Sequence, residues 1–333
     1  MRIDIHSHLM SVAFIEHLMG GHSLPVAARE ENGYVTECAP RFALHHRPPI
    51  LDIHSKLQHM DQAGIDMAVL STALPYPAML GGAEADLWAT RLNDELAAVI
   101  TAHPERFAGW ANLGFGDPER TISEVDRCVD ELGLAGFQVF SNVAGRPVDA
   151  PDVLAVLEHI VERNAAIHLH PTLPANQVPL DPAIMTAIAF PTDTSLAVTR
   201  LIGAGLFDRQ PVIIASHLGG VLPWLRDRLA THSQLSAPFP SQQALARPLA
   251  EYLDLLHVDT VAYGLAPLQL CYDQLGAGRL LFGTDHPFAD PGRPGLLIDD
   301  LLCTEAERSS ILAGNALRLL RLNAPQTIVP RAS

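Results

Sequence analysis

The sequence predicts one α/β domain with the (β/α)8 architecture of a TIM barrel and an inserted segment after the first strand. Two observations support this class: short apolar runs alternate eight times with longer segments of helical period, and no glycine-rich nucleotide loop follows the first run. Eight strands are the number that a closed parallel barrel requires. The predicted strands cover residues 2–6, 66–72, 107–113, 136–140, 166–170, 211–216, 257–261 and 279–285.

The segments between the strands have the spacing of helices that bury one face. In the segment 85–103, Leu92, Leu96 and Ile100 recur at helical spacing, and the segment 118–132 begins with a proline, which suits a first turn. Each segment is long enough to connect two neighbouring parallel strands. The other predicted helices cover residues 152–164, 193–206 and 304–322.

Residues 11–53 interrupt this alternation. The segment contains paired glycines and paired prolines, shows little helical period, and is far longer than an ordinary connection between a strand and a helix. We expect it to form an insertion near the barrel mouth, within a single domain of residues 1–333, either as structural decoration or as part of the substrate site. Segments 175–191 and 230–248 are further candidates for loops that close a pocket or meet another subunit.

The composition argues against several classes of partner. The formal net charge is −15 and no stretch is rich in lysine or arginine, so we expect neither nucleic acid nor an anionic membrane as the main partner. No apolar run reaches the length of a membrane span, and the first residues resemble a strand rather than a signal peptide, so we expect a cytoplasmic protein. The cysteines are scattered, which suits reduced, buried thiols: Cys38, Cys128, Cys271 and Cys303.

The first predicted strand ends in two histidines that are one residue apart. Side chains at positions i and i+2 of a strand point to the same face, so His6 and His8 can present both imidazoles to one metal ion while Ser7 points away. A His-x-His pair is common by chance, and on its own it would support this interpretation only weakly. Three later strand ends strengthen it.

These three strand ends also carry side chains that bind metals. His170 ends the fifth predicted strand, His217 ends the sixth, and Asp285 ends the eighth, at the edge of a barrel where active sites are built. His168 is expected to pack one layer below His170. A single histidine or aspartate at a strand end is commonly a buried hydrogen-bonding residue, but the joint pattern favours a site with one metal ion that activates water.

A family resemblance rests on five motifs: IDIHSH, HLHP, SHLGG, GTDHPF and GNALRLL. Together they resemble the amidohydrolase superfamily, in the branch that contains aminocarboxymuconate-semialdehyde decarboxylase and related decarboxylases. By this resemblance, His6, His8, His170 and Asp285 would hold the metal. His217 would be the acid/base residue beside it, and Asp285 would both bind the metal and orient the reacting groups.

The resemblance implies a mononuclear metal-dependent decarboxylase of a small unsaturated or aromatic carboxylic acid. A metal-dependent hydrolase of a lactone, amide or ester is the alternative, because the same residues would serve both reactions. A barrel that only binds its ligand is disfavoured, since all five polar site positions are present. The implied cofactor is one divalent ion, zinc first and manganese or cobalt as alternatives. The implied assembly is a homodimer or a larger homo-oligomer.

The number of lysines in the chain bears on whether the site can hold one metal ion or two. Binuclear relatives bridge two metals with a carboxylated lysine at the end of the fourth strand, but the chain has a single lysine, Lys56, and the fourth predicted strand ends at Phe140. A lysine bridge of that kind is therefore impossible, and a mononuclear centre is favoured.

Two cations are candidates for binding the substrate carboxylate. Lys56 lies near the position at which related decarboxylases carry a carboxylate-binding arginine, so it would act as a point charge, although a solvated helix lysine is an equal alternative. Arg47 is the second candidate. The resemblance transfers the substrate poorly, because His217 is followed by Leu-Gly-Gly rather than three glycines, and no arginine after Arg228 matches the one that a neighbouring subunit supplies in those decarboxylases.

Overall fold

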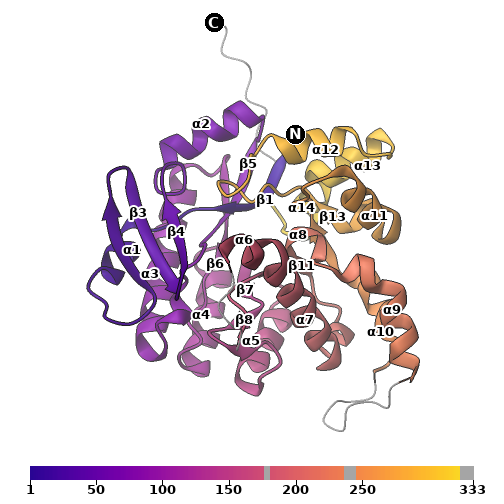
Figure 1. Ribbon diagram of the computed structural model, residues 1–333, viewed down its shortest axis with the longest axis horizontal. Coiled ribbons are helices and arrows are strands. Elements are labelled where there is room, and N and C mark those ends of the chain that lie inside the picture. The colour runs from indigo at the N-terminus through magenta and orange to yellow at the C-terminus, as the bar shows by residue number, and fades with distance from the viewer. Residues whose placement is uncertain (176–180, 236–244, 323–333) are drawn as a thin grey trace, which may run out of the picture.

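The computed structural model describes residues 1–175, 181–235 and 245–322. Their main sheet has eight strands that pair in parallel around a central axis, with helices on the outside (Figure 1). The predicted fold class is confirmed, and each of the eight predicted strands overlaps an observed one. In spatial order these are β1 (Ile3–His8), β5 (Met67–Ser71), β6 (Phe107–Ala111), β7 (Gly136–Phe140), β10 (Ala166–His170), β11 (Ile213–Ala215), β12 (His257–Asp259) and β13 (Leu280–Leu281).

The barrel closes between the first strand and the segment that follows the last one. The N–H of Ile5 donates to the carbonyl of Phe282 at 2.9 Å, and the N–H of His8 donates to the carbonyl of His286 at 2.8 Å. Ser7 and His286 form an isolated parallel bridge at this seam. Because β13 itself has two residues, the closure depends on these few contacts.

The helices cover the outside of the barrel (Figure 1). Side-chain caps begin three of them, at Asp52, Asp117 and Thr304, where each side-chain oxygen accepts a backbone N–H of the first turn. The predicted helix 304–322 is divided by a wider turn, in which the Ile311 carbonyl accepts the N–H of Phe282, the residue after β13. The main helices are α2 (Ile53–Ala63), α3 (Gly82–Ala102), α4 (Pro118–Asp130), α5 (Pro151–Glu162), α7 (Phe190–Gly203), α9 (Leu222–Leu235), α11 (Leu265–Leu275), α12 (Arg293–Asp299), α13 (Glu305–Ser309) and α14 (Asn315–Leu319).

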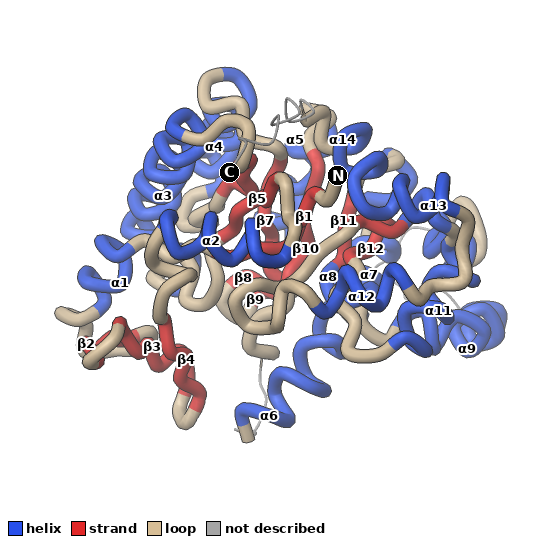
Figure 2. Tube along the Cα trace, turned by 90° about the horizontal axis from the view of Figure 1, so that it is seen from above, coloured by secondary structure: helices blue, strands red, loops and turns tan. Residues whose placement is uncertain are grey.

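Residues 11–53 form a helix and a small antiparallel sheet. The elements are α1 (Val12–Leu18), β2 (Val26–Glu30), β3 (Gly33–Ala39) and β4 (Phe42–His46). In Figure 2 this sheet lies on the same side of the barrel as β8 (Asn142–Val143) and β9 (Arg146–Pro147), which follow the C-terminal end of β7. Phe42 contacts Phe190 of α7 with ring centroids 6.0 Å apart. Of the two other predicted loops, residues 176–180 and 236–244 lie outside the described part of the chain.

The interior of the barrel is apolar near the N-terminal ends of the strands and polar near their C-terminal ends. Met67, Val69 and Trp110 belong to a buried cluster that also contains Ala316 and Leu320, so the end of the chain's last described helix closes the bottom. The Trp110 ring stacks on His168 at a centroid distance of 5.2 Å. The histidines near the C-terminal ends of the strands therefore pack against this apolar cluster.

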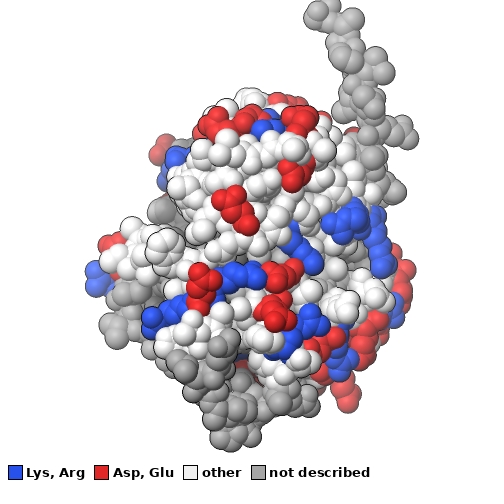
Figure 3. Space-filling model, turned by 90° about the vertical axis from the view of Figure 1, so that its right-hand side faces the viewer, with Lys and Arg blue, Asp and Glu red and all other residues white. Residues whose placement is uncertain are grey.

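The outer surface carries charges of both signs. On the face shown in Figure 3, acidic and basic side chains are interspersed and no continuous basic surface is visible. Among the described residues, the structure contains no helix with the length and apolar character that crossing a bilayer requires.

Candidate metal centre

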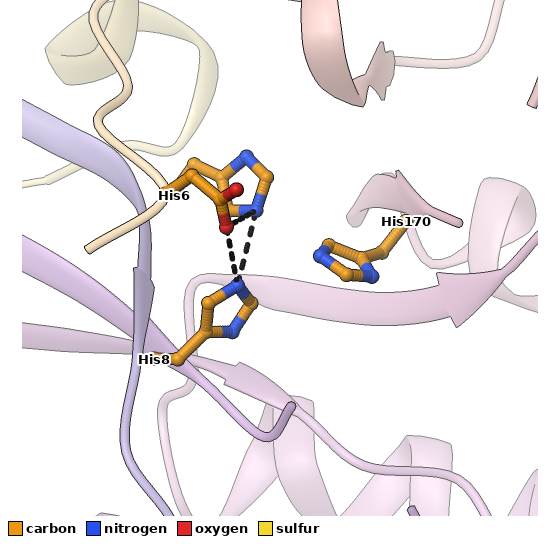
Figure 4. A group of neighbouring side chains, drawn as sticks. His6, His8 and His170 are labelled. Atoms are coloured by element: carbon orange, nitrogen blue, oxygen red, sulfur yellow. Dashed lines mark hydrogen bonds and ion pairs between the residues drawn. The ribbon is translucent and has the colours of Figure 1, made fainter. Parts of the chain in front are cut away.

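His6, His8, His170 and Asp285 converge at the C-terminal ends of their strands. One potential ligand atom from each residue lies within 4.8 Å of the others, and all four residues are buried. The Nε2 atoms of His6 and His8 are 3.1 Å apart, and Asp285 Oδ1 is 3.1 Å from His8 Nε2 and 3.4 Å from His6 Nε2. Figure 4 shows the three imidazole rings turned toward one shared space. The structure thus brings together the four residues that the sequence predicted as ligands.

Local backbone geometry explains how Asp285 reaches this position. Its φ of 60° lies in the left-handed region, and its N–H donates to the carbonyl of His6 at 2.8 Å. Gly283, two residues earlier, allows the close approach of β1, because a Cβ there would lie 3.1 Å from the Cβ of His6 and 3.0 Å from that of Asp259. A larger residue at position 283 would push the carboxylate away from the histidines.

The Nδ1 atom of each of the three histidines already has a hydrogen-bond partner. His6 Nδ1 lies 2.6 Å from Asp259 Oδ2, His8 Nδ1 lies 3.1 Å from Ser71 Oγ, and His170 Nδ1 donates to the backbone carbonyl of the next residue at 2.8 Å. With the proton on Nδ1, each Nε2 lone pair faces the shared space. His170 Nε2 is buried without a hydrogen-bond partner. Three such lone pairs and a carboxylate oxygen fit a divalent metal ion well.

Electrostatics favours the ligand form of these side chains. Burial lowers the pKa of His8 to about 4 and that of His170 well below its usual value, so both imidazoles are neutral near pH 7. Burial alone would raise the pKa of Asp285, but the charge of His6 and the hydrogen bonds from His217 and His8 hold that pKa well below its usual range. A neutral imidazole and an ionised carboxylate are the forms that bind metals.

The pKa of His6 moves the other way. Burial lowers it, but the carboxylates of Asp285 and Asp259 outweigh burial, so the pKa of His6 is raised. Two carboxylates close to one imidazole create a negative potential at the shared space. The same potential would attract a divalent cation.

His217 lies beside the four-residue group and outside it. It follows β11 with φ 54° and ψ 56°, at the start of a turn of positive φ that continues to Gly220. A Cβ on Gly220 would lie 2.2 Å from the carbonyl oxygen of Pro191, so the turn requires glycine there. His217 Nε2 is 3.4 Å from Asp285 Oδ2, and its Nδ1 is buried without a partner. This position suits a group that exchanges protons with what binds at the centre.

His168 packs below the centre. Its Nε2 lies 3.1 Å from Ser216 Oγ, and its ring centroid is 4.9 Å from that of His6. His6, His168 and Asp259 form a second group of possible ligand atoms among the described residues. Because this group shares His6, whose Nδ1 is held by Asp259, we assign it no second ion.

The structure does not place the two predicted substrate cations at the centre. The Lys56 side chain is fully buried between α2 and the barrel wall, with Nζ 3.1 Å from Ser7 Oγ and 2.9 Å from His286 Nδ1. The alternative of a solvated helix lysine is therefore wrong, because α2 packs its inner face against β1. Burial lowers the pKa of Lys56 to about 7. Arg47 has a 60% exposed side chain and pairs with Glu30 at 3.6 Å, in the small antiparallel sheet region.

The sequence analysis missed Asp259. Its Oδ2 atom holds His6 Nδ1, while Oδ1 accepts the backbone N–H groups of Leu218 at 3.2 Å and Val261 at 3.0 Å. The side chain therefore fixes the His6 ring and the turn after β11 together. The sequence does contain a pattern that could have identified it, because Asp259 lies near the C-terminal end of a predicted barrel strand, as Asp285 does.

We expect Asp259→Asn to weaken metal binding by about 10- to 100-fold, the usual effect of a lost carboxylate partner behind a ligand histidine. The amide has two possible orientations. In one, its NH2 group faces the backbone N–H donors of Leu218 and Val261, which then lose their acceptor. In the other, the NH2 group faces His6 Nδ1, which then loses its acceptor. Calorimetric titration of metal-free protein with Mn²⁺ measures the affinity. Asp254→Asn, the same change at an exposed residue paired with Arg226, is the control. An unchanged affinity in Asp259→Asn would remove this residue from the centre.

The comparisons with known proteins agree on one family. The family model described as Amidohydrolase matches residues 3–322. A gamma-resorcylate decarboxylase from Polaromonas sp. is 32% identical over 83% of this chain and 90% of its own length. A 2-amino-3-carboxymuconate-6-semialdehyde decarboxylase from Dictyostelium discoideum is 30% identical over 80% of this chain and 76% of its own length.

Solved structures share the fold. The crystal structure of 5-carboxyvanillate decarboxylase from Sphingomonas paucimobilis has a TM-score of 0.82 at 23% identity and covers 97% of this chain and 99% of its own. A dihydroxybenzoic acid decarboxylase from Polaromonas sp., solved with bound manganese and the inhibitor 2-nitroresorcinol, has a TM-score of 0.77 at 27% identity. It covers 96% of this chain and 97% of its own.

Proposed function

Because the chain belongs to the amidohydrolase family, we propose that it is a metal-dependent decarboxylase that removes the carboxyl group from a small aromatic or unsaturated carboxylic acid. The observation that carries the proposal is the convergence of three Nε2 atoms and one carboxylate oxygen at the barrel mouth. Relatives that match most of the chain are named 2-amino-3-carboxymuconate-6-semialdehyde decarboxylase and gamma-resorcylate decarboxylase.

The proposed ligands of one divalent ion are His6, His8, His170 and Asp285. When bound, the ion would act as a Lewis acid toward the carboxylate and a neighbouring oxygen of the substrate. Zinc suits a site with three imidazole ligands, and manganese is bound in the Polaromonas sp. decarboxylase structure, so both are candidates. The proposal includes a single domain in which residues 11–53 are an insertion near the mouth.

His217 is the proposed acid/base residue. Decarboxylation breaks the bond between the carboxyl group and its carbon and forms a C–H bond on the same carbon, so a protein group must deliver a proton there as carbon dioxide leaves. His217 Nε2 lies 3.4 Å from Asp285 Oδ2, so these two side chains can hold and pass that proton. Both side chains are largely buried, which limits competing exchange with water.

A substrate panel distinguishes decarboxylation from the alternative, hydrolysis. Metal-loaded protein is incubated with hydroxybenzoic acids, unsaturated carboxylic acids, lactones and esters, and carbon dioxide release and ring opening are followed separately. We expect carbon dioxide from at least one aromatic or unsaturated acid, with one deuterium on the product carbon when the reaction runs in D2O. The His6→Ala variant is the control for background reaction. Lactone or ester hydrolysis without carbon dioxide release would favour the hydrolase instead.

A further inference from the structure

The amine of Lys56 lies at the seam where the barrel closes. Its Nζ is 3.1 Å from Ser7 Oγ, 2.9 Å from His286 Nδ1 and 3.4 Å from the carbonyl oxygen of His286. These three acceptors match the three protons of an ammonium group. The same carbonyl accepts the N–H of His8 at 2.8 Å. Lys56 therefore contacts two of the three chain segments that carry the proposed ligands, β1 with His6 and His8, and the final segment with Asp285.

The residues that Lys56 contacts are direct neighbours of those ligands along the chain. Ser7 separates His6 from His8, and His286 follows Asp285. β13 ends at Leu281, so beyond it this seam is formed by a few backbone hydrogen bonds between β1 and the final segment and by the isolated bridge between Ser7 and His286. A rigid link at this point fixes the distance between the imidazoles of β1 and the carboxylate of the final segment.

We infer that Lys56 is a positioning residue that holds the metal ligands of β1 and Asp285 in register. The inference rests on the proposed metal centre and goes beyond it, because it gives the chain's single lysine a role outside the substrate site. Burying an amine is costly, and an apolar residue would fill the same space without that cost. Three directed hydrogen bonds to the seam are what an apolar residue cannot supply.

The test compares Lys56→Met and Ser7→Ala with wild-type protein. Lys56→Met keeps the length of the side chain and removes all three hydrogen bonds, whereas Ser7→Ala removes one acceptor. Met60→Leu is the matched control, because Met60 is buried on the same face of α2 one turn later and changes nothing at the seam. The readouts are Mn²⁺ affinity by calorimetry, the visible absorption spectrum of the Co²⁺-loaded protein, and thermal unfolding of the metal-free protein.

We expect Lys56→Met to weaken Mn²⁺ binding by about tenfold or more and to alter the Co²⁺ spectrum, as changes behind metal ligands typically do. Ser7→Ala should shift both readouts in the same direction by less, and Met60→Leu should match wild type. If Lys56→Met fails to fold, Ser7→Ala decides, and a wild-type affinity in that variant contradicts the inference.

Two further outcomes count against the inference. Unchanged affinity and spectrum in folded Lys56→Met would leave the amine a structural role only. A loss of kcat/KM for a carboxylate substrate at unchanged metal affinity would make Lys56 a substrate cation instead. If the wild-type protein binds no divalent metal, the proposed function itself is wrong. If the wild-type protein binds metal and Lys56→Met binds it equally well, only this inference is wrong.

Discussion

His6→Ala and Asp285→Ala are each expected to leave the protein without metal and without activity. His6 supplies a nitrogen that lies within 3.4 Å of the two neighbouring ligand atoms, and Asp285 supplies the only negative charge among the four proposed ligands. Losing either side chain leaves three protein ligands, and a metal ion held by only three protein ligands exchanges readily. Wild-type protein should carry about one ion per chain, as elemental analysis after gel filtration can measure.

The control for this prediction is His22→Ala, which removes an exposed histidine. It should keep the wild-type metal content and activity. Metal content close to one ion per chain in either alanine variant would contradict the proposed ligand set. A ratio near two in wild-type protein would contradict the mononuclear centre, which was inferred from the lack of any lysine other than Lys56.

The strands were predictable because local pattern and burial agree along them. β10 matches the predicted segment 166–170, and all five of its residues are buried. The last strands are shorter than predicted: β13 spans Leu280–Leu281, whereas the predicted strand extends to residue 285. Beyond Leu281 the pairing with β1 is interrupted at Thr284, whose N–H and hydroxyl donate to the two carboxylate oxygens of Asp4. Sequence pattern does not reveal that such a buried carboxylate ends the strand.

The candidate ligands could be predicted because strand periodicity places His6 and His8 on one face and barrel topology brings the strand ends together. The placement of Lys56 could not, since it depends on how α2 packs against the seam between β1 and the final segment. The role of Asp259 depends on a contact across 253 positions of the chain. Long-range contacts of this kind follow from the closed barrel and not from local sequence.

His217→Ala is expected to lower kcat by about 100-fold or more while most of the metal remains bound, because a positioned acid/base group contributes about that factor. The residue lies outside the four-atom group, and its Nε2 lies 3.4 Å from Asp285 Oδ2, whereas Oδ1 faces His6 and His8, so the metal should tolerate its loss. Steady-state kinetics and elemental analysis on the same preparation separate the two effects.

Comparing the metal content of His217→Ala with that of His6→Ala decides whether His217 is a ligand or an acid/base residue. If His217→Ala loses metal to the same extent as His6→Ala, then His217 is a ligand and the proposed set must be enlarged. If it keeps both metal and wild-type turnover, a group other than His217 delivers the proton. His232→Ala on α9, where the histidine is exposed, should leave kcat unchanged and controls for the loss of an imidazole near that part of the barrel.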